Sequence, residues 1–436
     1  MINTIFKLNG YDINHAIQKY NNILNKNDDD FMFWKNEQKW KIAHYHFENN
    51  QLYKDKVVNN FPKKWEELPI LTKKDFQSDK DYLVSKHYQN KNIYTSSTSG
   101  YSGTPILIYK NKFAHSMTWA NVLYHYNNYE LKLRSKQARF YGIPLSQHKF
   151  YYEKLKDLLF NRDRFSIFDL SDDKMELFLN LFKNKKYTYI YGYANSLYTF
   201  SQFLLNKGII LNHLCPSLKC CISTSEMLNP KMRKAMKQAF GPNVNIINEY
   251  GASELGIIAF EYDNQLLISE QNIFVEVDYS NDAFGKILVT DLFNQAMPII
   301  RYDIGDLGSL STIFYKGRER KVLSTLMGRT NDLIKLKNGR RIAGFTFYYV
   351  LLAVFDQFEI KNEIKNFMIR QIDYDFFIID IVAADHLTLE KEKKIIQIAQ
   401  NYLNDLTIKI DFNYSDNPYY ETSGKMKHFQ SELNLE

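Results

Sequence analysis

The apolar run Tyr187-Thr188-Tyr189-Ile190-Tyr191 is followed by two similar runs at Leu218–Ser223 and Val244–Asn248. Each run has the length of a buried strand. Between the first two runs the pattern predicts a helix over Ser196–Leu205, and a second helix is expected after Asn229. Strands that alternate with helices at this spacing are typical of a parallel sheet with crossover helices.

The ends of these two helices carry residues that favour helix boundaries. Gly208 closes the first helix. Asn229 can cap the second helix, Pro230 suits its first turn, and Gly241 stands just beyond its end. Side-chain caps, an N-terminal proline and a C-terminal glycine all suit the backbone groups that a helix end leaves unpaired. They strengthen the prediction of crossover helices.

The rest of the chain predicts an α/β protein of two domains. Residues 1–327 would form a large N-terminal domain with parallel sheets and crossover helices, in which residues 266–302 make a β-rich subdomain. Residues 328–436 would form a small α+β domain. Helices are expected within 12–60 and at Phe113–Glu130, Phe345–Phe358 and Leu389–Leu403, and strands at Ala138–Gly142, Leu266–Ser269, Ile273–Val277, Lys286–Thr290, Leu333–Leu336, Phe367–Arg370, Phe376–Val382 and Thr407–Phe412. A basic stretch that ends near Phe168 gives no clear pattern.

The composition is that of a globular chain. Hydrophobic residues make up 45% of the 436 residues, and the net charge of +7 is spread along the chain. A mildly basic chain suits an anionic ligand such as a nucleotide, whereas binding to nucleic acid or a membrane leaflet would call for a clustered basic face. The first residues do not resemble a signal peptide, and no apolar run approaches the length of a membrane span, so we expect a cytoplasmic protein.

Three cysteines, Cys215, Cys220 and Cys221, lie in one short segment near His213. Adjacent residues of a strand point to opposite faces of the sheet, which is poor geometry for a zinc site. We therefore expect reduced thiols in the core of the protein.

A loop rich in serine, threonine and glycine precedes the apolar run Ile106–Tyr109. It reads Tyr94-Thr95-Ser96-Ser97-Thr98-Ser99-Gly100-Tyr101-Ser102-Gly103-Thr104-Pro105. Glycines let backbone N–H groups approach a phosphate closely, and the hydroxyls add donors. No lysine follows Gly103, as a Walker loop would require. By composition alone a solvated turn is the simpler interpretation, so a phosphate loop depends on partners elsewhere in the chain.

Four later segments supply such partners. They are Asn248-Glu249-Tyr250-Gly251-Ala252-Ser253-Glu254, Ile300-Arg301-Tyr302-Asp303-Ile304-Gly305-Asp306, Gly328-Arg329-Thr330-Asn331-Asp332-Leu333-Ile334-Lys335 and Glu421-Thr422-Ser423-Gly424-Lys425-Met426-Lys427. Taken singly, the first two are apolar strands that end in common turns, the third joins two domains, and the last is a solvated tail.

Taken in order, the loop and these segments resemble the core motifs of the adenylate-forming superfamily of acyl-CoA synthetases, adenylation domains and luciferases. The segment Leu68–Lys73, the run Tyr191-Gly192-Tyr193 and the short C-terminal domain are similar to the phenylacetate–coenzyme A ligase branch, and within it to proteins associated with capsular polysaccharide loci. The resemblance covers nearly the whole chain from about residue 30. It implies a ligase that uses ATP and Mg²⁺ to activate a carboxylic acid as an acyl-adenylate. The acyl group would then pass to coenzyme A, a carrier-protein thiol or an amine, after rotation of a mobile C-terminal domain.

The resemblance also implies a role for each matched residue. Residues expected to hold the β- and γ-phosphates of ATP are Thr98, Ser99, Gly100, Ser102, Gly103 and Thr104. Those expected around the adenine and ribose are Ser223, Thr224, Ser225, Glu226, Glu249, Tyr250 and Gly251, with Asp306 on the ribose hydroxyls and Arg329 reaching the nucleotide from the domain junction. Ser253 would contact the α-phosphate, Glu254 would bind Mg²⁺, and Lys425 would bridge the carboxylate and the α-phosphate. Glu254, Arg329 and Lys425 are thus the expected catalytic residues.

Three positions depart from the family pattern. No lysine follows Pro105, the pair Thr224-Ser225 replaces two glycines, and Asn331 stands where the hinge usually has aspartate. The acid pocket is expected between residues 141–192 and 223–250, where the aromatic residues are compatible with an aryl acid or a sugar. Two alternatives stay open, namely a catabolic aryl- or acyl-CoA ligase and a catalytically silent nucleotide-binding scaffold.

Overall fold

The computed structural model describes residues 6–58, 60–97, 106–141, 147–167, 170–279, 284–329, 333–343, 347–348, 350–351, 354, 364–383, 386–415 and 429–433. The chain divides into two compact units. The first comprises Met1–Ala283, Ile287–Ile304 and Ser309–Ser324, and the second Phe284–Lys286, Gly305–Gly308 and Thr325–Glu436. The domain boundary at residue 328 and the mobility of the C-terminal part stay predictions.

The largest sheet of the described residues has 11 strands in the order β10-β11-β12-β13-β9-β8-β7-β6-β5-β3-β4. Its parallel part is made of β4 (Arg162–Ser166), β3 (Gln137–Tyr141), β5 (Tyr189–Tyr193), β6 (Cys220–Thr224) and β7 (Asn245–Ala252). The remaining strands are β8 (Gly256–Tyr262), β9 (Gln265–Ile268), β10 (Ile273–Asp278), β11 (Gly285–Asp291), β12 (Tyr302–Tyr315) and β13 (Arg318–Arg329). The antiparallel pairing of β7 with β8 joins the two parts. The parallel sheet predicted from the stretch at Tyr187–Asn248 is confirmed.

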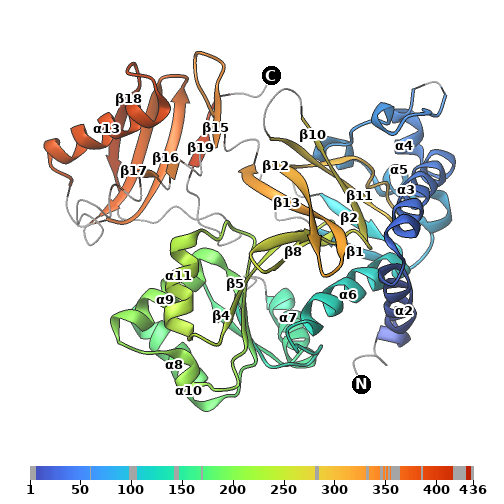
Figure 1. Ribbon diagram of the computed structural model, residues 1–436, viewed down its shortest axis with the longest axis horizontal. Coiled ribbons are helices and arrows are strands. Elements are labelled where there is room, and N and C mark those ends of the chain that lie inside the picture. The colour runs from blue at the N-terminus through green and yellow to red at the C-terminus, as the bar shows by residue number, and fades with distance from the viewer. Residues whose placement is uncertain are drawn as a thin grey trace. The chain divides into compact units, whose positions relative to one another are not determined.

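Three helices cover one face of the parallel strands, namely α8 (Asp172–Asn184), α9 (Ala194–Asn206) and α11 (Pro230–Phe240) (Figure 1). Their apolar side chains form one core with Ala138, Phe140 and Ile190 of the strands. The predicted boundaries of α11 are confirmed, because the side chain of Asn229 accepts a hydrogen bond from the Met232 backbone and Gly241 follows the last residue with φ of 121°. Local capping chemistry thus sets where this crossover helix begins and ends.

The opposite face of the parallel strands packs against α6 (Lys112–Asn127). Cys220 belongs to the core on this face, whereas Cys221 belongs to the core under α8, α9 and α11. The prediction that these neighbours point to opposite faces is therefore confirmed. All three cysteines are buried free thiols.

The N-terminal helices are α2 (Ile13–Leu24), α3 (Asp28–Asn49) and α4 (Gln51–Lys56), and short helices follow as α5 (Lys80–Leu83) and α10 (Leu211–Leu214). The side chain of Asn27 caps α3, and three aspartates occupy its first turn, where the helix dipole favours negative charge. Near the other end of α3, Nε2 of His46 lies 2.7 Å from the backbone oxygen of Asn294. The contact fixes α3 against the loop that follows β11.

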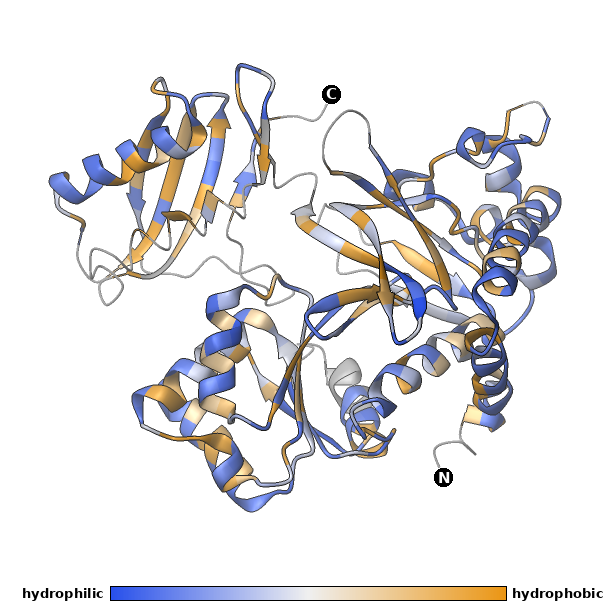
Figure 2. Cartoon of the chain, viewed as in Figure 1, coloured by the Kyte–Doolittle hydropathy of each residue, from blue (hydrophilic) through white to orange (hydrophobic). Residues whose placement is uncertain are grey.

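The second unit holds a sheet in the order β18-β17-β16-β19 and a two-stranded ribbon of β14 (Leu333–Lys335) and β15 (Arg341–Ala343). The strands of the sheet are β16 (Ile364–Asp373), β17 (Phe376–Ala383), β18 (Lys409–Tyr414) and β19 (Phe429–Ser431). Helix α13 (Leu389–Leu403) has the predicted bounds and buries Ile395, Ala399 and Leu403. Figure 2 shows hydrophobic strands beside a largely hydrophilic outer surface of α13. The spacing of apolar residues at about 3.6 positions predicts this helix well, because one face of α13 is apolar and the other is polar.

Other predictions differ from the structure. The stretch without a clear pattern contains α7 (Gln147–Leu159) and β4, and α8 follows. The strand expected to end at Gly305-Asp306 instead begins at Tyr302 and continues through that dipeptide to Tyr315. Pairing with neighbouring strands overrides the local preference of Gly-Asp for a turn. The helix expected at Phe345–Phe358 falls largely outside the described residues.

Among the helices of the described residues, none combines the length and the apolar character that crossing a lipid bilayer would require.

Candidate functional site

The residues of the expected phosphate loop, Thr98 to Pro105, lie outside the described residues. The strands that flank it, β1 (Tyr94–Ser97) and β2 (Leu107–Lys110), pair antiparallel, with Ser97 opposite Leu107. Lys110 at the end of β2 forms a buried ion pair of 2.9 Å with Asp291. Asp291 also accepts hydrogen bonds from the backbone N–H groups of Phe293 and Asn294. This network anchors the base of the hairpin, since a buried charge pair with its remaining lone pairs satisfied is well held.

The segment Ser223–Glu226 lies at the carboxyl end of β6. Ser223 and Thr224 close the strand, and Ser225 follows with φ of 66°. A non-glycine residue in this left-handed region is uncommon. The backbone at this position therefore has the geometry of a glycine site, although the sequence supplies serine where the family pattern has glycine.

Glu226 has a defined partner. Its Oε2 accepts hydrogen bonds from the backbone N–H of Asn195, at 2.8 Å, and from the Asn195 side-chain amide, at 3.1 Å. Asn195 is in the first turn of α9, where unpaired N–H groups and the helix dipole favour a carboxylate. Glu226 thus fixes α9 against the end of β6, and its expected contact with adenine stays a prediction.

The second expected nucleotide segment forms the end of β7 and the turn to β8. Ala252 pairs with Gly256, so Ser253, Glu254 and Leu255 make the turn between the strands. A Cβ on Gly251 would lie 2.6 Å from the backbone oxygen of Gly256, which explains why glycine stands there. Ser253 is exposed and Glu254 is partly exposed. The turn therefore presents a hydroxyl and a carboxylate near the carboxyl end of the parallel strands, where ligands of such sheets bind.

Tyr302 contacts the turn from β12. Its hydroxyl lies 3.3 Å from Glu254 Oε1, and its ring is buried against Phe76. Leu71 bridges to Tyr302 as an isolated parallel pair, and the Asp303 N–H donates to the Leu71 oxygen at 2.9 Å. The segment Leu68–Lys73 is one of those that are similar to the phenylacetate–coenzyme A ligase branch. It thus has a structural role, because it holds Tyr302, which orients Glu254.

The same segment is fixed at both ends. Thr72 and Asp75 form a reciprocal capping box at the short helix Lys73–Phe76. On the other side, the guanidinium of Arg301 donates to the backbone oxygens of Glu66, at 2.6 Å, and Leu68, at 2.7 Å. Arg301 is itself in the left-handed region with φ of 45°. A backbone held in this costly conformation indicates that the surrounding contacts determine it strongly.

Glu249 is placed differently from an exposed nucleotide ligand. It is buried, and it accepts hydrogen bonds from the hydroxyls of Tyr191, at 2.9 Å, and Tyr126, at 3.4 Å. Burial raises the pKa of the Glu249 carboxyl to about 7, and the tyrosine hydrogen bonds and the Arg139 charge oppose the rise. The structure therefore brings Glu249 together with an aromatic and cationic cluster rather than with the turn at Ser253.

This cluster comprises Tyr126, Arg139, Tyr141, Tyr191 and Glu249. The sequence pointed to Glu249 and to the ranges that hold Tyr141 and Tyr191, but it did not single out Tyr126 or Arg139. One feature of the sequence could have indicated the cluster, because Arg139 is a charged residue within an apolar strand. The guanidinium carbon of Arg139 lies 4.4 Å from the ring centroid of Tyr141 and 4.8 Å from that of Tyr191. Such stacking stabilises a cation that is removed from water.

The remaining predicted residues divide into two groups. Asp306 lies on β12 and Arg329 ends β13, and these two strands are neighbours in the sheet. Lys425 and Asn331 fall outside the described residues. The expected roles of all four residues stay predictions.

Glu254 suits the magnesium ion that the resemblance implies. No group of three or more histidine, cysteine, aspartate or glutamate side chains is placed to hold a metal within the described ranges. Proteins that bind Mg²⁺ together with a nucleotide commonly supply only one or two carboxylates, and the phosphates and waters complete the octahedron. A single partly exposed carboxylate, oriented by Tyr302, fits that mode.

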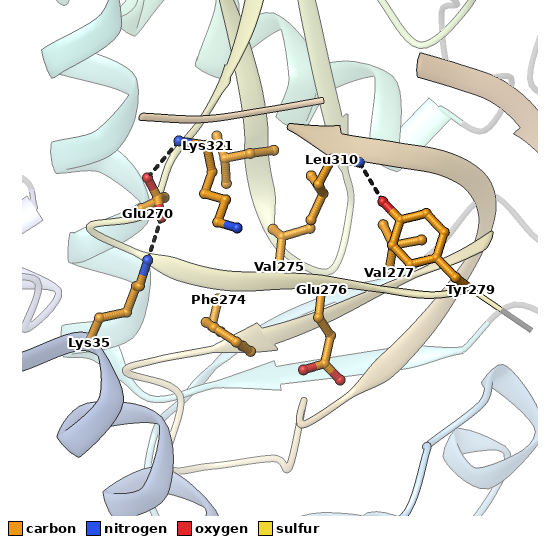
Figure 3. A pocket seen from close by; sticks show the side chains of 10 residues that line it. Lys35, Glu270, Phe274, Val275, Glu276, Val277, Tyr279, Leu310 and Lys321 are labelled. Atoms are coloured by element: carbon orange, nitrogen blue, oxygen red, sulfur yellow. Dashed lines mark hydrogen bonds and ion pairs between the residues drawn. The ribbon is translucent and has the colours of Figure 1, made fainter. Parts of the chain in front are cut away.

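A cavity of about 290 Å³ lies elsewhere, between α3 and strands β9, β10, β12 and β13 (Figure 3). Lys35 and Glu270 line it as a buried ion pair of 2.6 Å, and Glu270 also accepts from the Lys321 backbone N–H at 3.2 Å. None of the predicted site residues lines this cavity. Its charged groups join α3 to the β-rich part of the sheet.

Comparisons by sequence link the chain to three characterised proteins. It is 21% identical to protein CapK of Staphylococcus aureus over 326 residues, which cover 73% of this chain and 69% of CapK. It is 25% identical to phenylacetate-coenzyme A ligase of Thermus thermophilus over 43% of this chain and 48% of that enzyme. Over 29% of this chain it is 28% identical to indoleacetate–lysine synthetase of Pseudomonas savastanoi, covering 30% of that protein. No protein-family model matches the chain.

Comparisons by structure give the same fold over most of the chain. 2-Hydroxyisobutyryl-CoA ligase, solved with an acyl-AMP, matches with a TM-score of 0.67 at 13% identity, covering 93% of this chain and 90% of that one. The amide bond synthetase McbA of Marinactinospora thermotolerans matches with a TM-score of 0.51 at 15% identity over 77% of this chain and 67% of that one. Apart from CapK, the names of these proteins are those of two coenzyme A ligases, an indoleacetate–lysine synthetase and an amide bond synthetase. The chain is thus similar in sequence to CapK and to phenylacetate-coenzyme A ligase, and its fold is that of the solved CoA ligase and amide bond synthetase.

Proposed function

We propose that this protein activates a carboxylic acid with ATP, forming an acyl-adenylate and pyrophosphate, and then transfers the acyl group to a thiol or amine. The observation that carries the proposal is the turn at Ser253 and Glu254. It stands near the carboxyl end of the parallel strands, and Tyr302 orients its carboxylate. Solved proteins of this fold hold an acyl-AMP or ATP, which supports the use of ATP.

The chemistry explains why these residue types are needed. A carboxylate must attack the α-phosphorus although both partners are negatively charged. In the proposal Thr98 to Thr104 hold the outer phosphates, Ser253 donates to the α-phosphate, and Lys425 neutralises charge that gathers between the two reacting groups. Preorganised donors and cations of this kind typically contribute a factor on the order of 10²–10³ each.

The nucleotide side of the site is proposed to be held by five residues and the metal by one. Tyr250 would stack on the adenine, Asp306 would accept hydrogen bonds from the ribose hydroxyls, and Arg329 would reach the nucleotide from the domain junction. Glu254 would hold Mg²⁺, which would supply charge neutralisation at the phosphates. Ser223 and Thr224 end the strand against which the adenine would rest.

The acceptor is proposed as a thiol or an amine, because relatives of both kinds exist. The names of two relatives specify coenzyme A and lysine, and a protein of the same fold is an amide bond synthetase. A role in the assembly of a bacterial surface polysaccharide is the finer proposal, and the similarity to CapK supports it.

Product analysis tests the proposal. The full chain is incubated with ATP, Mg²⁺ and a panel of aryl, amino and sugar acids, with coenzyme A or an amine as acceptor. We expect AMP and pyrophosphate, together with a thioester or amide detected by mass spectrometry. Formation of ADP and phosphate, or binding of ATP without any turnover, would instead favour a different enzyme class or a silent scaffold.

A further inference from the structure

Three arginines lie on one face of the two neighbouring strands β3 and β4. Arg139 is opposite Arg164 in the parallel register, and Arg162 is opposite Gln137. Helix α7 covers part of this face with two carboxylates. Arg164 Nη2 lies 2.7 Å from Glu153 Oε2 and 3.1 Å from Asp157 Oδ1, and Arg162 also pairs with Asp157. Two of the three arginines therefore have carboxylate partners from α7.

Arg139 has no such partner in the part of the chain that the structure describes. Its Nε is buried and makes no hydrogen bond to a described residue. A buried donor that is left unpaired is costly, the more so when it belongs to a charged group. Each unpaired group of this kind in a native protein calls for an explanation, and a ligand is one.

The surroundings of Arg139 resemble the wall of a binding site. Its guanidinium lies against the rings of Tyr141 and Tyr191, and the Tyr191 hydroxyl donates to Glu249. Tyr141 is the last residue of β3, and its ring centroid lies 4.4 Å from that of Tyr193, the last residue of β5. This wall thus reaches the carboxyl end of the parallel strands, where a ligand of such a sheet binds.

The carboxylate of the wall already accepts hydrogen bonds from its neighbours. Arg139, Tyr141 and Tyr191 are each only partly buried. Glu249 accepts from two tyrosines, and burial raises its pKa to about 7, so it does not act as a full counter-ion to the arginine at neutral pH. Among the residues that the structure describes, none accepts a hydrogen bond from the Arg139 Nε.

We propose that Arg139 selects the acid substrate, and that the acid carries a second oxygen function, a hydroxyl or a carboxylate, that accepts a hydrogen bond from the Arg139 Nε. This inference rests on the proposed function, since it concerns the acid that is adenylated. Tyr141 and Tyr193 pack against the carbon skeleton between the two ends of the acid. A plain fatty or aryl acid leaves the donor unpaired, and a site built around a hydrogen bond discriminates strongly against a ligand that lacks it.

The test compares acids that differ in one group. The aryl set is phenylacetate with its para-hydroxy and para-carboxy derivatives, and the aliphatic set is hexanoate, ω-hydroxyhexanoate and adipate. Acid-dependent exchange of labelled pyrophosphate into ATP is measured for wild type, Arg139→Met and Arg139→Lys. Arg164→Met is the matched control, because it removes the neighbouring arginine from the same sheet face.

In wild type we expect an oxygen-bearing acid to exceed the unsubstituted acid of its set by at least about tenfold in kcat/KM, as a hydrogen bond to a charged group implies. Comparing the hydroxy acid with the dicarboxylic acid of each set shows whether the site prefers a hydroxyl or a carboxylate as the second oxygen function. Arg139→Met should lose this preference mainly through KM, whereas Arg164→Met should keep it. Arg139→Lys keeps the charge but lacks the Nε donor, so it should lose most of the preference as well.

Two results would overturn the proposal. One is a wild type that prefers the unsubstituted acids, and the other is an Arg139→Met variant that loses all acids equally. If no acid supports exchange, the proposed function fails, and calorimetry of the same acids with the four proteins decides the inference alone. Oxygen-bearing acids that bind wild type and Arg164→Met but not the two Arg139 variants would support it, and equal or absent binding would refute it.

Discussion

At the scale of single residues, burial changes what a charged side chain does. The sequence marks Glu249 as part of a nucleotide segment, but the fold surrounds it with Tyr191, Tyr126 and Arg139. These partners come from strands and a helix that are distant in sequence, so spacing within one motif does not reveal them. Glu254, five positions later, lies on a turn and keeps the partly exposed position that a metal ligand needs.

The pKa of Glu249 gives a prediction for stability. Burial raises this pKa from 4.5 to about 7, so the folded protein binds the proton more tightly than the unfolded chain. The stability that comes from the protonated carboxyl is fully present below pH 4.5 and is lost as the pH rises to about 7. Glu249→Gln removes this dependence. The free energy of unfolding of the variant minus that of wild type should therefore rise by about 3 kcal/mol across this range, since one pKa unit corresponds to ~1.4 kcal/mol.

Urea unfolding at a series of pH values measures this difference directly. Every other titrating group is common to the two proteins and cancels in the subtraction. A difference that does not vary with pH would show that Glu249 titrates normally in the folded state.

The same comparison explains how much of the candidate site the sequence could predict. Motif order in the sequence points to Gly251 and Ser225, and the structure shows backbone geometry at both positions that favours glycine, whereas their contacts with a nucleotide stay predictions. Arg139 and Tyr302 are not found in this way, because each acts through a contact across strands. A charged residue in an apolar strand is the only local sign of such a contact.

At the scale of elements, the turn between β7 and β8 leaves no space for a side chain at Gly251. Gly251→Ala would bring a Cβ to 2.6 Å from the Gly256 backbone oxygen, and backbone cannot move aside as a flexible side chain can. We expect a loss of stability of about 1–3 kcal/mol, as for other forced contacts. Because the turn carries Ser253 and Glu254, pyrophosphate exchange should fall as well.

Gly317→Ala at the turn between β12 and β13 is the control. Gly317 has φ of 79°, and a Cβ there would meet no atom within 4 Å, so alanine adds backbone strain without a contact. The control should lose stability by roughly 1–2 kcal/mol and keep its exchange rate. Equal pyrophosphate exchange rates in Gly251→Ala and Gly317→Ala would show that the β7–β8 turn has no part in catalysis.

The fold was predictable where local signals agree with tertiary contacts. α11 and α13 have caps and apolar faces that specify them without help from the rest of the chain. α7 and β4 were not recognised, because their acidic and basic residues pair with each other and hide the apolar pattern. β12 runs through a Gly-Asp pair because its neighbours in the sheet supply the hydrogen bonds that a turn would otherwise make.

At the scale of the whole molecule, the candidate residues come from segments spread along the chain. The hairpin of β1 and β2, the ends of β6 and β7 and the tyrosine of β12 belong to one compact unit, whereas Asp306 and Arg329 belong to the other. An enzyme that must neutralise several negative charges needs several hydrogen-bond donors and cations. When these groups come from different helices and strands, each of them can be held rigidly in position. The proposed adenylation is therefore a property of the full chain.

The exchange of labelled pyrophosphate into ATP measures the proposed adenylation by itself. The full chain is assayed with Mg²⁺ and an acid but without an acceptor, so that only the first half-reaction contributes, and Glu254→Gln is assayed beside it after its unfolding midpoint is shown to be unchanged. The account predicts exchange that requires an acid in wild type and falls by a factor on the order of 10²–10³ in the variant. Folded wild-type protein that exchanges no pyrophosphate with any acid of the panel, or a variant that exchanges as fast as wild type, would contradict it.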